Sequence, residues 1–454
     1  MSGDHSADAA AIEPARAASG GRFLLCVWPF AGHIHPNLAV AQALREAGHE
    51  VAFYTGATAA PAIQREGFAL FPFRRVDEQR VEKIVLSPEG ILSSSGKPLR
   101  TKRLWREWVL ETVPEQVADL EEAIAAWAPE AILTDPAMWA PFLILHETKK
   151  IPVAVLSVIP ACHISRDQGP ILGFPLPKPR SSYGRLRGAI LRKLSRAFLS
   201  DVPRDANRLR AGHGLPPIRG SVSDFAAQMP LYMVPSSPEF DYERTDLPPS
   251  VEYVGPCLWS RISEEAAPEW LSQRDSTVPL IYASEGTVHW KPRLLHAVAA
   301  GLRDLPVEAV LTTGKHRDPD ELDLGPRPLA PNVRAERWVD LNALLPHLQA
   351  MVTIGGPSTL MAALARGIPV VIVPFTWDHP ETAWRVVESG AGIRLSPREC
   401  TPGKMREAVL RVLNDPSYRR NAERLAESFS RLRGAGRAAE LAAKLLPDHD
   451  RRAQ

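Results

Sequence analysis

One histidine and one aspartate stand where they could share acid–base chemistry. His33 lies in the turn Pro29–Pro36, which follows the apolar run Phe23–Trp28, and Asp135 follows the run Glu130–Thr134. Both runs read as buried strands, and the carboxyl ends of parallel strands meet at one edge of a sheet. We therefore expect both side chains to face one crevice. There the carboxylate can accept the imidazole N–H, orient the ring and stabilise its cation.

Simpler roles remain open for both residues. An isolated histidine more often caps a helix or is satisfied in a partly buried position, and an aspartate before a helix is a common N-cap. His33 and His35 could also form a metal pair, but no third ligand follows with convincing spacing, so no metal site is predicted. The cysteines lack CxxC spacing, which indicates neither a disulfide framework nor a zinc site and suits a reducing cytoplasm. They are Cys26, Cys162, Cys257 and Cys400.

The stretch Met351–Thr382 carries the longest functional signal. A strand ends at Thr353, a glycine-rich turn follows, and a helix begins near Ser358 and Thr359. Free backbone N–H groups, two hydroxyls and the positive end of a helix dipole suit a phosphate or diphosphate. Such turns are also common where glycine only permits packing. After the next strand come Asp378 and His379, again at the carboxyl end of a sheet.

Strand and helix signals alternate in both halves of the 454 residues, which predicts an α/β fold of two or three domains. Residues 74–106 read as loop-rich, and residues 163–230 break the alternation. The predicted division is a disordered tail 1–21, an N-terminal domain 22–240, a linker 241–275, a C-terminal domain 276–425, and a returning C-terminal helix with its tail, 426–454.

The bulk composition excludes several classes of protein. Lys and Arg number 54 against 52 Asp and Glu, which argues against a nucleic-acid partner. No apolar run reaches 18 residues, so no transmembrane segment is predicted. The N-terminal residues lack the pattern of a signal peptide. The basic amphipathic segment Tyr183–Leu199 could touch an anionic membrane surface or an amphiphilic acceptor, but a solvated helix covering the sheet is the favoured interpretation.

In their order along the chain, these motifs resemble the family 1 glycosyltransferases of the GT-B fold, especially bacterial enzymes that decorate natural products. The resemblance spans roughly residues 22–440 and rests on three segments: PFAGHIHPNLAVAQALREAGHEVAFYT, TVPLIYASEGTV, and RWVDLNALLPH with VTIGGPSTLMAALARGIPVVIVPFTWDHPETA. It implies two facing Rossmann-like domains, the first for the acceptor and the second for a nucleotide sugar. The last helix would cross back to the first domain.

The resemblance also implies roles for individual residues. His33 matches the general base and Asp135 its partner, and Trp338 matches a residue that packs against the nucleotide base. The positions near the diphosphate are Ser284, Thr287, Gly355, Gly356, Ser358 and Thr359. Asp378 and His379 match the pair that contacts sugar hydroxyls. The aromatic residues expected to contact a hydrophobic acceptor are Phe30, Trp105, Trp108 and Trp139.

The chain departs from the family pattern at the donor site. Ile354 replaces the histidine that usually touches the diphosphate, which should weaken donor binding. Asp340 and Leu341 stand near the usual Pro-Gln, and Thr382 stands where asparagine is common. His379 replaces the usual glutamine, a weak hint toward galactose over glucose.

The expected activity is inverting, metal-independent transfer from a UDP- or TDP-linked sugar to a hydrophobic small-molecule acceptor. No cofactor beyond the nucleotide sugar is expected, and a homodimer is left open. Two other functions compete with this one. The chain could be a sugar-nucleotide epimerase of the same fold, or a catalytically degenerate auxiliary protein, for which Ile354 is the supporting feature.

Overall fold

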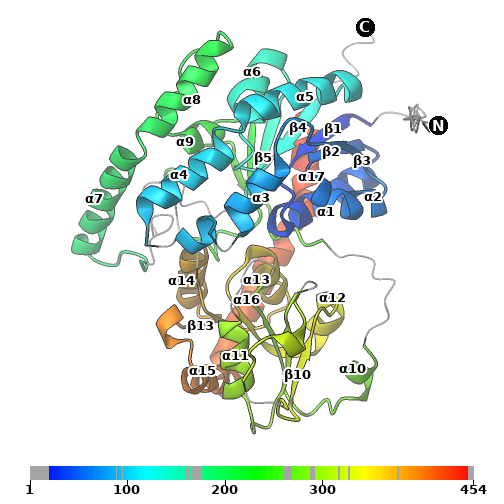
Figure 1. Cartoon of the computed structure of the whole chain (residues 1–454), viewed down its shortest axis with the longest axis vertical. Coiled ribbons are helices and arrows are strands. Elements are labelled where there is room, and N and C mark those ends of the chain that lie inside the picture. The colour runs from blue at the N-terminus through cyan, green and yellow to red at the C-terminus, as the bar shows by residue number, and fades with distance from the viewer. Residues whose placement is uncertain are drawn as a thin grey trace, which may run out of the picture.

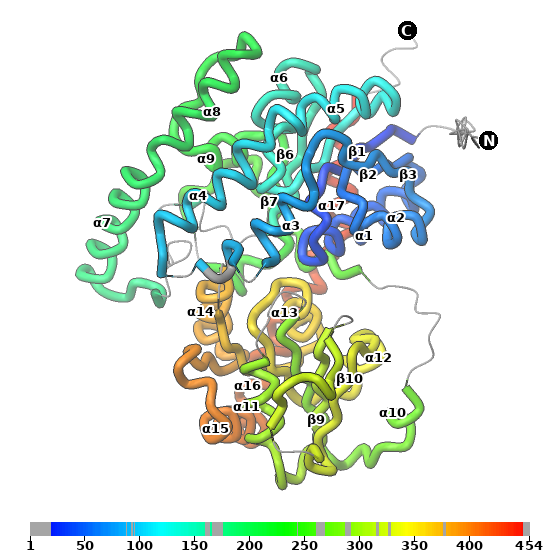
Figure 2. Tube along the Cα trace, in the orientation of Figure 1, coloured from blue at the N-terminus to red at the C-terminus, as the bar shows by residue number. Residues whose placement is uncertain are grey.

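The computed structural model describes residues 20–87, 89–94, 96–158, 164–165, 176–242, 244–259, 268–286, 292–314, 317–325, 328–375 and 378–447. Over these ranges the chain forms two α/β bodies that lie one above the other (Figure 1). The N-terminal half forms the upper body of the view, and most of the C-terminal half forms the lower one. The last helix returns to the upper body (Figure 2).

The first body is built on seven parallel strands in the order β3-β2-β1-β4-β5-β6-β7. The strands are β1 (Arg22–Cys26), β2 (Glu50–Thr55), β3 (Ala69–Pro72), β4 (Ala131–Thr134), β5 (Val153–Leu156), β6 (Leu231–Val234) and β7 (Val251–Tyr253). The helices are α1 (Ala31–Glu46), α2 (Ala60–Arg65), α3 (Glu78–Leu86), α4 (Pro98–Val109), α5 (Val113–Trp127), α6 (His146–Lys149), α7 (Ser182–Phe198), α8 (Asp201–Gly212) and α9 (Val222–Ala226). A π-helical turn, Pro141–Leu145, precedes α6.

The second body is built on six parallel strands in the order β10-β9-β8-β11-β12-β13. The strands are β8 (Leu280–Ser284), β9 (Glu308–Thr312), β10 (Val333–Glu336), β11 (Leu348–Thr353), β12 (Val370–Ile372) and β13 (Gly392–Arg394). The helices are α10 (Glu269–Gln273), α11 (Arg293–Gly301), α12 (Leu341–Leu344), α13 (Pro357–Leu364), α14 (His379–Ser389), α15 (Pro402–Asn414) and α16 (Pro416–Leu432). Helix α17 (Ala435–Ala443) follows α16 and packs against α1 of the first body.

Alternation along the central strands produces an apolar core on each face of a sheet. In β1, Leu24 belongs to the cluster under α4 and α5, while Phe23 and Leu25 belong to the cluster under α1 and α17. Successive strand side chains point to opposite faces, so a strand covered on both faces must be apolar throughout. Strand order reverses between β1 and β4 and between β8 and β11. Ligands bind beyond the carboxyl ends of such reversals.

Several element predictions were wrong. Residues 74–106, expected to be loop-rich, contain α3 and most of α4, and their short amphipathic runs were hidden by the turn residues between them. Residues 163–230, in contrast, break the alternation as predicted, because their described part holds α7, α8 and α9 in succession and no strand. Strand β6, which has proline on both sides and was not predicted, pairs with β5.

The structure also places parts of the chain differently from the predicted division. Strand β7 lies within the expected linker 241–275 but pairs with β6 of the first sheet. Helix α16, which spans the expected boundary at 425, packs with Leu425 and Phe429 in the second body, so the chain crosses back only after Leu432. Helix α7 exists where predicted but does not cover the sheet, because none of its residues, all of them described, is buried.

Candidate active site

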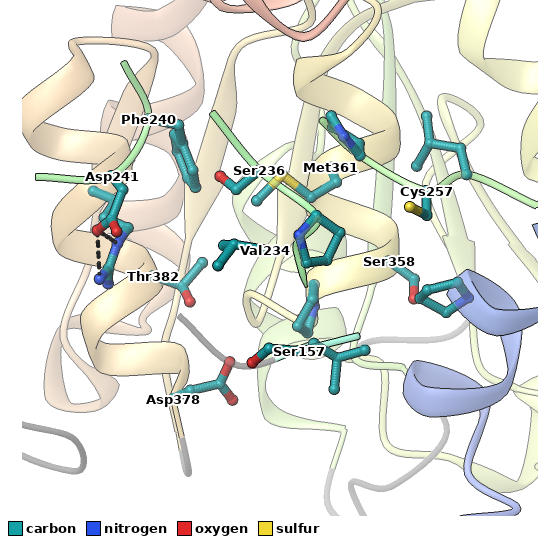
Figure 3. A pocket seen from close by; sticks show the side chains of 17 residues that line it. Ser157, Val234, Ser236, Phe240, Asp241, Cys257, Ser358, Met361, Asp378 and Thr382 are labelled. Atoms are coloured by element: carbon teal, nitrogen blue, oxygen red, sulfur yellow. Dashed lines mark hydrogen bonds and ion pairs between the residues drawn. The ribbon is translucent and has the colours of Figure 1, made fainter. Parts of the chain in front are cut away.

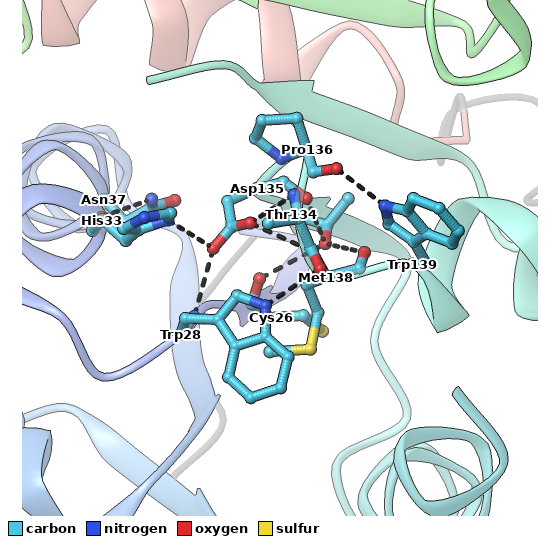
Figure 4. A network of polar contacts seen from close by, with 10 residues as sticks. Cys26, Trp28, His33, Asn37, Thr134, Asp135, Pro136, Met138 and Trp139 are labelled. Carbon is cyan, nitrogen blue, oxygen red and sulfur yellow. Dashed lines mark hydrogen bonds and ion pairs between the residues drawn. The ribbon is translucent and has the colours of Figure 1, made fainter. Parts of the chain in front are cut away.

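His33 and Asp135 meet at the strand reversal of the first sheet. His33 Nδ1 lies 3.1 Å from Asp135 Oδ2, and the carboxylate is fully buried. The same Oδ2 accepts the backbone N–H of Trp28 at 3.1 Å (Figure 4). Asp135 Oδ1 accepts the backbone N–H groups of Ala137 and Met138. Asp135 therefore both caps the turn that follows β4 and holds the histidine ring.

Local structure fixes the direction of the His33 ring. The turn was predicted to run from Pro29 to Pro36, but helix α1 already begins at Ala31. His33 therefore lies in the first turn of this helix. Asn37 Nδ2 donates to the His33 carbonyl at 2.9 Å. The rings of Phe30 and Trp108 pack edge-on against the imidazole. With Nδ1–H donated to Asp135, Nε2 is the unprotonated nitrogen and is available to accept a proton.

His35 has a different environment from its neighbour. Its ring stacks on Trp259 with 4.9 Å between centroids, and burial lowers the pKa of His35 to about 4. Within the described ranges, no group of three or more His, Cys, Asp or Glu side chains could hold a metal ion. His33 and His35 therefore have separate structural partners.

The strand reversal of the second sheet brings Ser284, at the end of β8, beside Thr353, at the end of β11. Helix α13 starts four residues after Thr353, and no side chain caps its N-terminus. Ser358 Oγ, in the first turn of α13, is buried and has no hydrogen-bond partner among the described residues. Unpaired N–H groups, a free hydroxyl and a helix dipole together make a site suited to an anion.

The turn before α13 is shaped by Gly355 and Ile354. Gly355 has φ of +98°, and a Cβ there would lie 2.7 Å from Ile372 Cδ1, so only glycine fits. Ile354 is 5% exposed and belongs to the core of the second body, although it also lines the cleft between the two bodies. The residue at the position expected to donate a hydrogen bond to a diphosphate is therefore apolar, and Ile354 forms an apolar wall of the cleft there.

The cleft between the two bodies has a volume of about 2570 Å³ and joins both strand reversals. From the first body it is lined by Phe30, His33, Trp105 and Trp108. From the second body it is lined by Ser284, Trp338, Gly356, Ser358, Thr359, Asp378 and His379. Most of the predicted site residues thus face one space.

Asp135 is fully buried and does not itself line the cleft. Two further predicted residues are also placed away from it. Trp139 does not line the cleft; its ring packs edge-on behind Trp105, and its Nε1 donates to the Pro136 carbonyl. Gly355 is buried under the turn, and its N–H donates to Thr353 Oγ1. Thr287 lies outside the described residues.

Comparison with known proteins agrees with this architecture. The model of the erythromycin biosynthesis protein CIII-like C-terminal domain matches residues 298–443. The chain is 33% identical over 417 residues to 4'-demethylrebeccamycin synthase of Lentzea aerocolonigenes, covering 90% of this chain and 96% of that protein. The chain belongs to the family 1 glycosyltransferases.

Two solved structures share the GT-B fold of this glycosyltransferase. The glycosyltransferase of kitacinnamycin superposes with a TM-score of 0.72 at 22% identity, over 94% of this chain and 100% of that one. The spinosyn rhamnosyltransferase SpnG, complexed with thymidine diphosphate, superposes with a TM-score of 0.64 at 18% identity, over 90% and 96%. The glycosyltransferase thus has a GT-B fold of two Rossmann-like bodies around a cleft.

Asp378 brings a carboxyl group to the cleft of the glycosyltransferase. Loss of water contacts raises the pKa of the Asp378 carboxyl to about 6, against the opposing attraction of Arg385 and His33. Asp378 precedes α14 without capping it, so its oxygens remain available to a ligand. His379 is almost fully buried and packs close to Gly355.

A smaller cavity lies behind Asp378 at the junction of the two bodies (Figure 3). Asp378 and Thr382 line it from the second body, and Ser157 and Val234 line it from the first. Beside it, the buried Asp241 carboxylate accepts bonds from Arg244, Arg385 and Tyr253. Burial opposes ionisation, but the two guanidinium groups hold the pKa of Asp241 below its usual range.

Sequence reasoning missed two charged features of the glycosyltransferase. Arg394, at the end of β13, lines the cleft and lies 4.9 Å from the Trp384 ring. Its position at a strand end was a usable signal, but β13 was not predicted. Glu285 accepts the Leu294 N–H at 2.5 Å and lies 3.7 Å from Arg317, while burial raises its pKa to about 7. No spacing in the sequence indicates that pair.

Proposed function

We propose that this glycosyltransferase moves a sugar, with inversion, from a UDP- or TDP-linked donor to a hydroxyl of a hydrophobic small molecule. The reaction proceeds without a metal ion, in the cytoplasm, in the biosynthesis of a natural product. The observation that carries the proposal is the His33–Asp135 pair, at 3.1 Å, on the opposite side of one cleft from the uncapped N-terminus of α13.

In the proposed reaction, His33 Nε2 removes the proton from the acceptor hydroxyl as its oxygen attacks the anomeric carbon. The bond from that carbon to the diphosphate breaks on the opposite face, which inverts the configuration. Asp135 holds the ring and stabilises the imidazolium that forms. Base assistance of this kind contributes about 10²–10⁴-fold. The leaving diphosphate is stabilised by the α13 N–H groups and by Ser358 Oγ.

Each substrate has a matching side of the cleft. Phe30, Trp105 and Trp108 present aromatic surface beside His33, which suits an apolar acceptor. On the donor side, Trp338 and Asp378 both line the cleft, where Trp338 can stack on the nucleotide base and Asp378 can accept hydrogen bonds from sugar hydroxyls. The SpnG complex with thymidine diphosphate supports a TDP donor, and 4'-demethylrebeccamycin synthase supports a natural-product acceptor.

The test is a panel of UDP- and TDP-sugars with hydrophobic hydroxylated acceptors, in the presence of EDTA. The expected result is acceptor-dependent release of UDP or TDP and a product whose anomeric configuration, read by NMR, is opposite to that of the donor. Retained configuration or loss of turnover with EDTA would refute the mechanism. Conversion of the donor without acceptor would indicate the epimerase instead.

A further inference from the structure

Helix α7 presents an apolar stripe to solvent. Tyr183, Leu186, Ile190 and Leu194 recur at the spacing of one helix face, and each is at least 51% exposed. The helix stands at the outer edge of the first body (Figure 1). Large exposed apolar side chains are common singly, but a contiguous stripe on a projecting helix marks a binding surface.

The same segment concentrates positive charge. Residues 176–200 contain seven Lys or Arg and no Asp or Glu, although the whole chain carries 54 basic against 52 acidic residues. Arg185, Arg192 and Arg196 lie on the helix face opposite the apolar stripe. Of the seven, Arg180 forms an ion pair with Glu388 of the second body. Five of the seven lie within α7 itself and leave it strongly basic, which is the composition of helices that lie in a lipid interface.

The helix also borders the acceptor side of the cleft. Leu191, Leu194 and Phe198 are among the cleft-lining residues, near Trp105 and Trp108. Lys102 of α4 donates to the Phe198 carbonyl, which ties the C-terminal end of α7 to the cleft wall. The C-terminal part of the helix, with Leu194 of the stripe and Arg192 and Arg196, thus borders the cleft, while Tyr183, Leu186 and Ile190 are exposed outside the cleft lining.

We propose that α7 docks the protein onto an anionic lipid surface, with Leu186 and Ile190 entering the interface and the basic residues contacting lipid headgroups. Charge favours this occupant over a second copy, because two α7 helices face to face would bring two strongly basic segments together. A single stripe is also narrow beside the roughly 800 Å² per partner of a standard protein interface. Docking in this orientation would place the acceptor side of the cleft near lipid-soluble compounds.

The experiment is co-sedimentation of the full-length protein, without donor or acceptor, with phosphatidylcholine vesicles that contain or lack about 30% phosphatidylglycerol. We expect binding only to the anionic vesicles, and a loss of binding between about 0.1 M and about 0.5 M salt, since screening weakens the headgroup attraction. Leu186→Glu should lower the partition coefficient by about tenfold. Leu99→Glu is the matched control, because Leu99 is 75% exposed on α4 and should leave binding unchanged.

Each outcome decides the proposal. No anionic-vesicle binding by folded protein, or equal losses in Leu186→Glu and Leu99→Glu, would overturn it. Sedimentation velocity that shows a dimer broken by Leu186→Glu would assign the surface to a second copy instead. A circular dichroism spectrum and thermal unfolding midpoint equal to those of the wild type show that Leu186→Glu is folded. Since no sugar transfer is measured, failure here leaves the proposed reaction untouched, and failure of that reaction leaves this result standing.

Discussion

The two sides of the cleft differ in how far their polar atoms are satisfied. On the first body, the Asp135 carboxylate already accepts three backbone N–H groups and His33. On the second body, α13 has an uncapped N-terminus, and Ser358 Oγ has no hydrogen-bond partner within the described part of the chain. The Asp135 carboxylate on the first body is thus fully bonded without a ligand, whereas the Ser358 hydroxyl on the second body is unpaired among the described residues.

This contrast assigns different tasks to the two sides. A buried polar group without a partner costs about 1–3 kcal/mol, so unpaired atoms persist most readily where a ligand satisfies them. A histidine that is already held by a hydrogen-bonded carboxylate needs little rearrangement during a reaction, so little free energy is lost in orienting it. We therefore expect changes on the first body to affect turnover and changes on the second body to affect donor affinity.

The largest expected effect comes from His33→Ala. Without the base, kcat should fall by about 10²–10⁴-fold, while affinity for free TDP or UDP stays unchanged. Initial rates and equilibrium titration of the same preparation measure both quantities. His213→Ala, at the exposed end of α8, is the control and should retain full activity. Wild-type turnover in His33→Ala would remove His33 from the reaction.

Asp135→Asn should lower kcat by about 10²-fold, because the amide no longer stabilises a His33 cation. It should also destabilise the fold by about 1–3 kcal/mol, since an NH₂ group then faces backbone N–H donors. Rates and urea unfolding measure the two effects. Asp304→Asn, an exposed change on the second body, provides the comparison. Unchanged rates with unchanged stability would show that Asp135 neither positions the His33 ring nor stabilises the turn after β4.

The Asp378 carboxyl should give donor binding its own pH dependence. Its pKa is raised from 3.8 to about 6, so it is ionised above about pH 6 and protonated below. Because the raised value favours the protonated form in the fold, ionised Asp378 weakens stability above pH 6, and that penalty fades toward pH 4. Sugar hydroxyls need the carboxylate as acceptor, so the intact donor should bind more weakly as pH falls through about 6.

Calorimetric titration of the intact donor from about pH 8 to about pH 5 measures this affinity, because the esterified diphosphate of the donor does not titrate there, unlike the terminal phosphate of free TDP or UDP. In Asp378→Asn the donor affinity should not change near pH 6. A change near pH 6 that persists in Asp378→Asn would assign the dependence to another group.

The smallest expected effect comes from restoring a donor at the apolar wall. Ile354→His should raise the affinity for free TDP or UDP by up to about tenfold, the range of one hydrogen bond to a charged group. Cys400→Ser, a buried polar change elsewhere in the same core, controls for the burial of polarity. Weaker nucleotide binding by a stable Ile354→His protein would mean that residue 354 does not face the diphosphate.

Much of the architecture could be predicted because its signals are local. The apolar runs around β1, β4, β8 and β11 end in polar or small residues, so the sequence alone places His33, Asp135 and Ser284 at strand ends. Helices α3 and α4 were missed because each offers only a short amphipathic run between turn residues. Because these helices were not predicted, the position of Trp108 on α4 could not be derived, although the residue itself was expected in the acceptor site.

Features that depend on distant contacts could not be predicted. Asp241 and Arg385 are 144 residues apart and meet only because the segment after β6 and helix α14 lie at the same junction. Trp139 was expected to contact the acceptor because it is aromatic and follows Asp135, but the packing of Trp105 in front of it decides its place. The exposure of α7 likewise follows from its projection beyond the sheet, which an amphipathic pattern alone does not determine.

The most direct test of this division of tasks is calorimetric titration of the wild-type protein and of His33→Ala with TDP and with UDP. The account predicts that at least one nucleotide binds and that its Kd is the same in both proteins, because the diphosphate site lies on the second body. Failure of both nucleotides to bind folded wild-type protein, or loss of binding in His33→Ala, would contradict it.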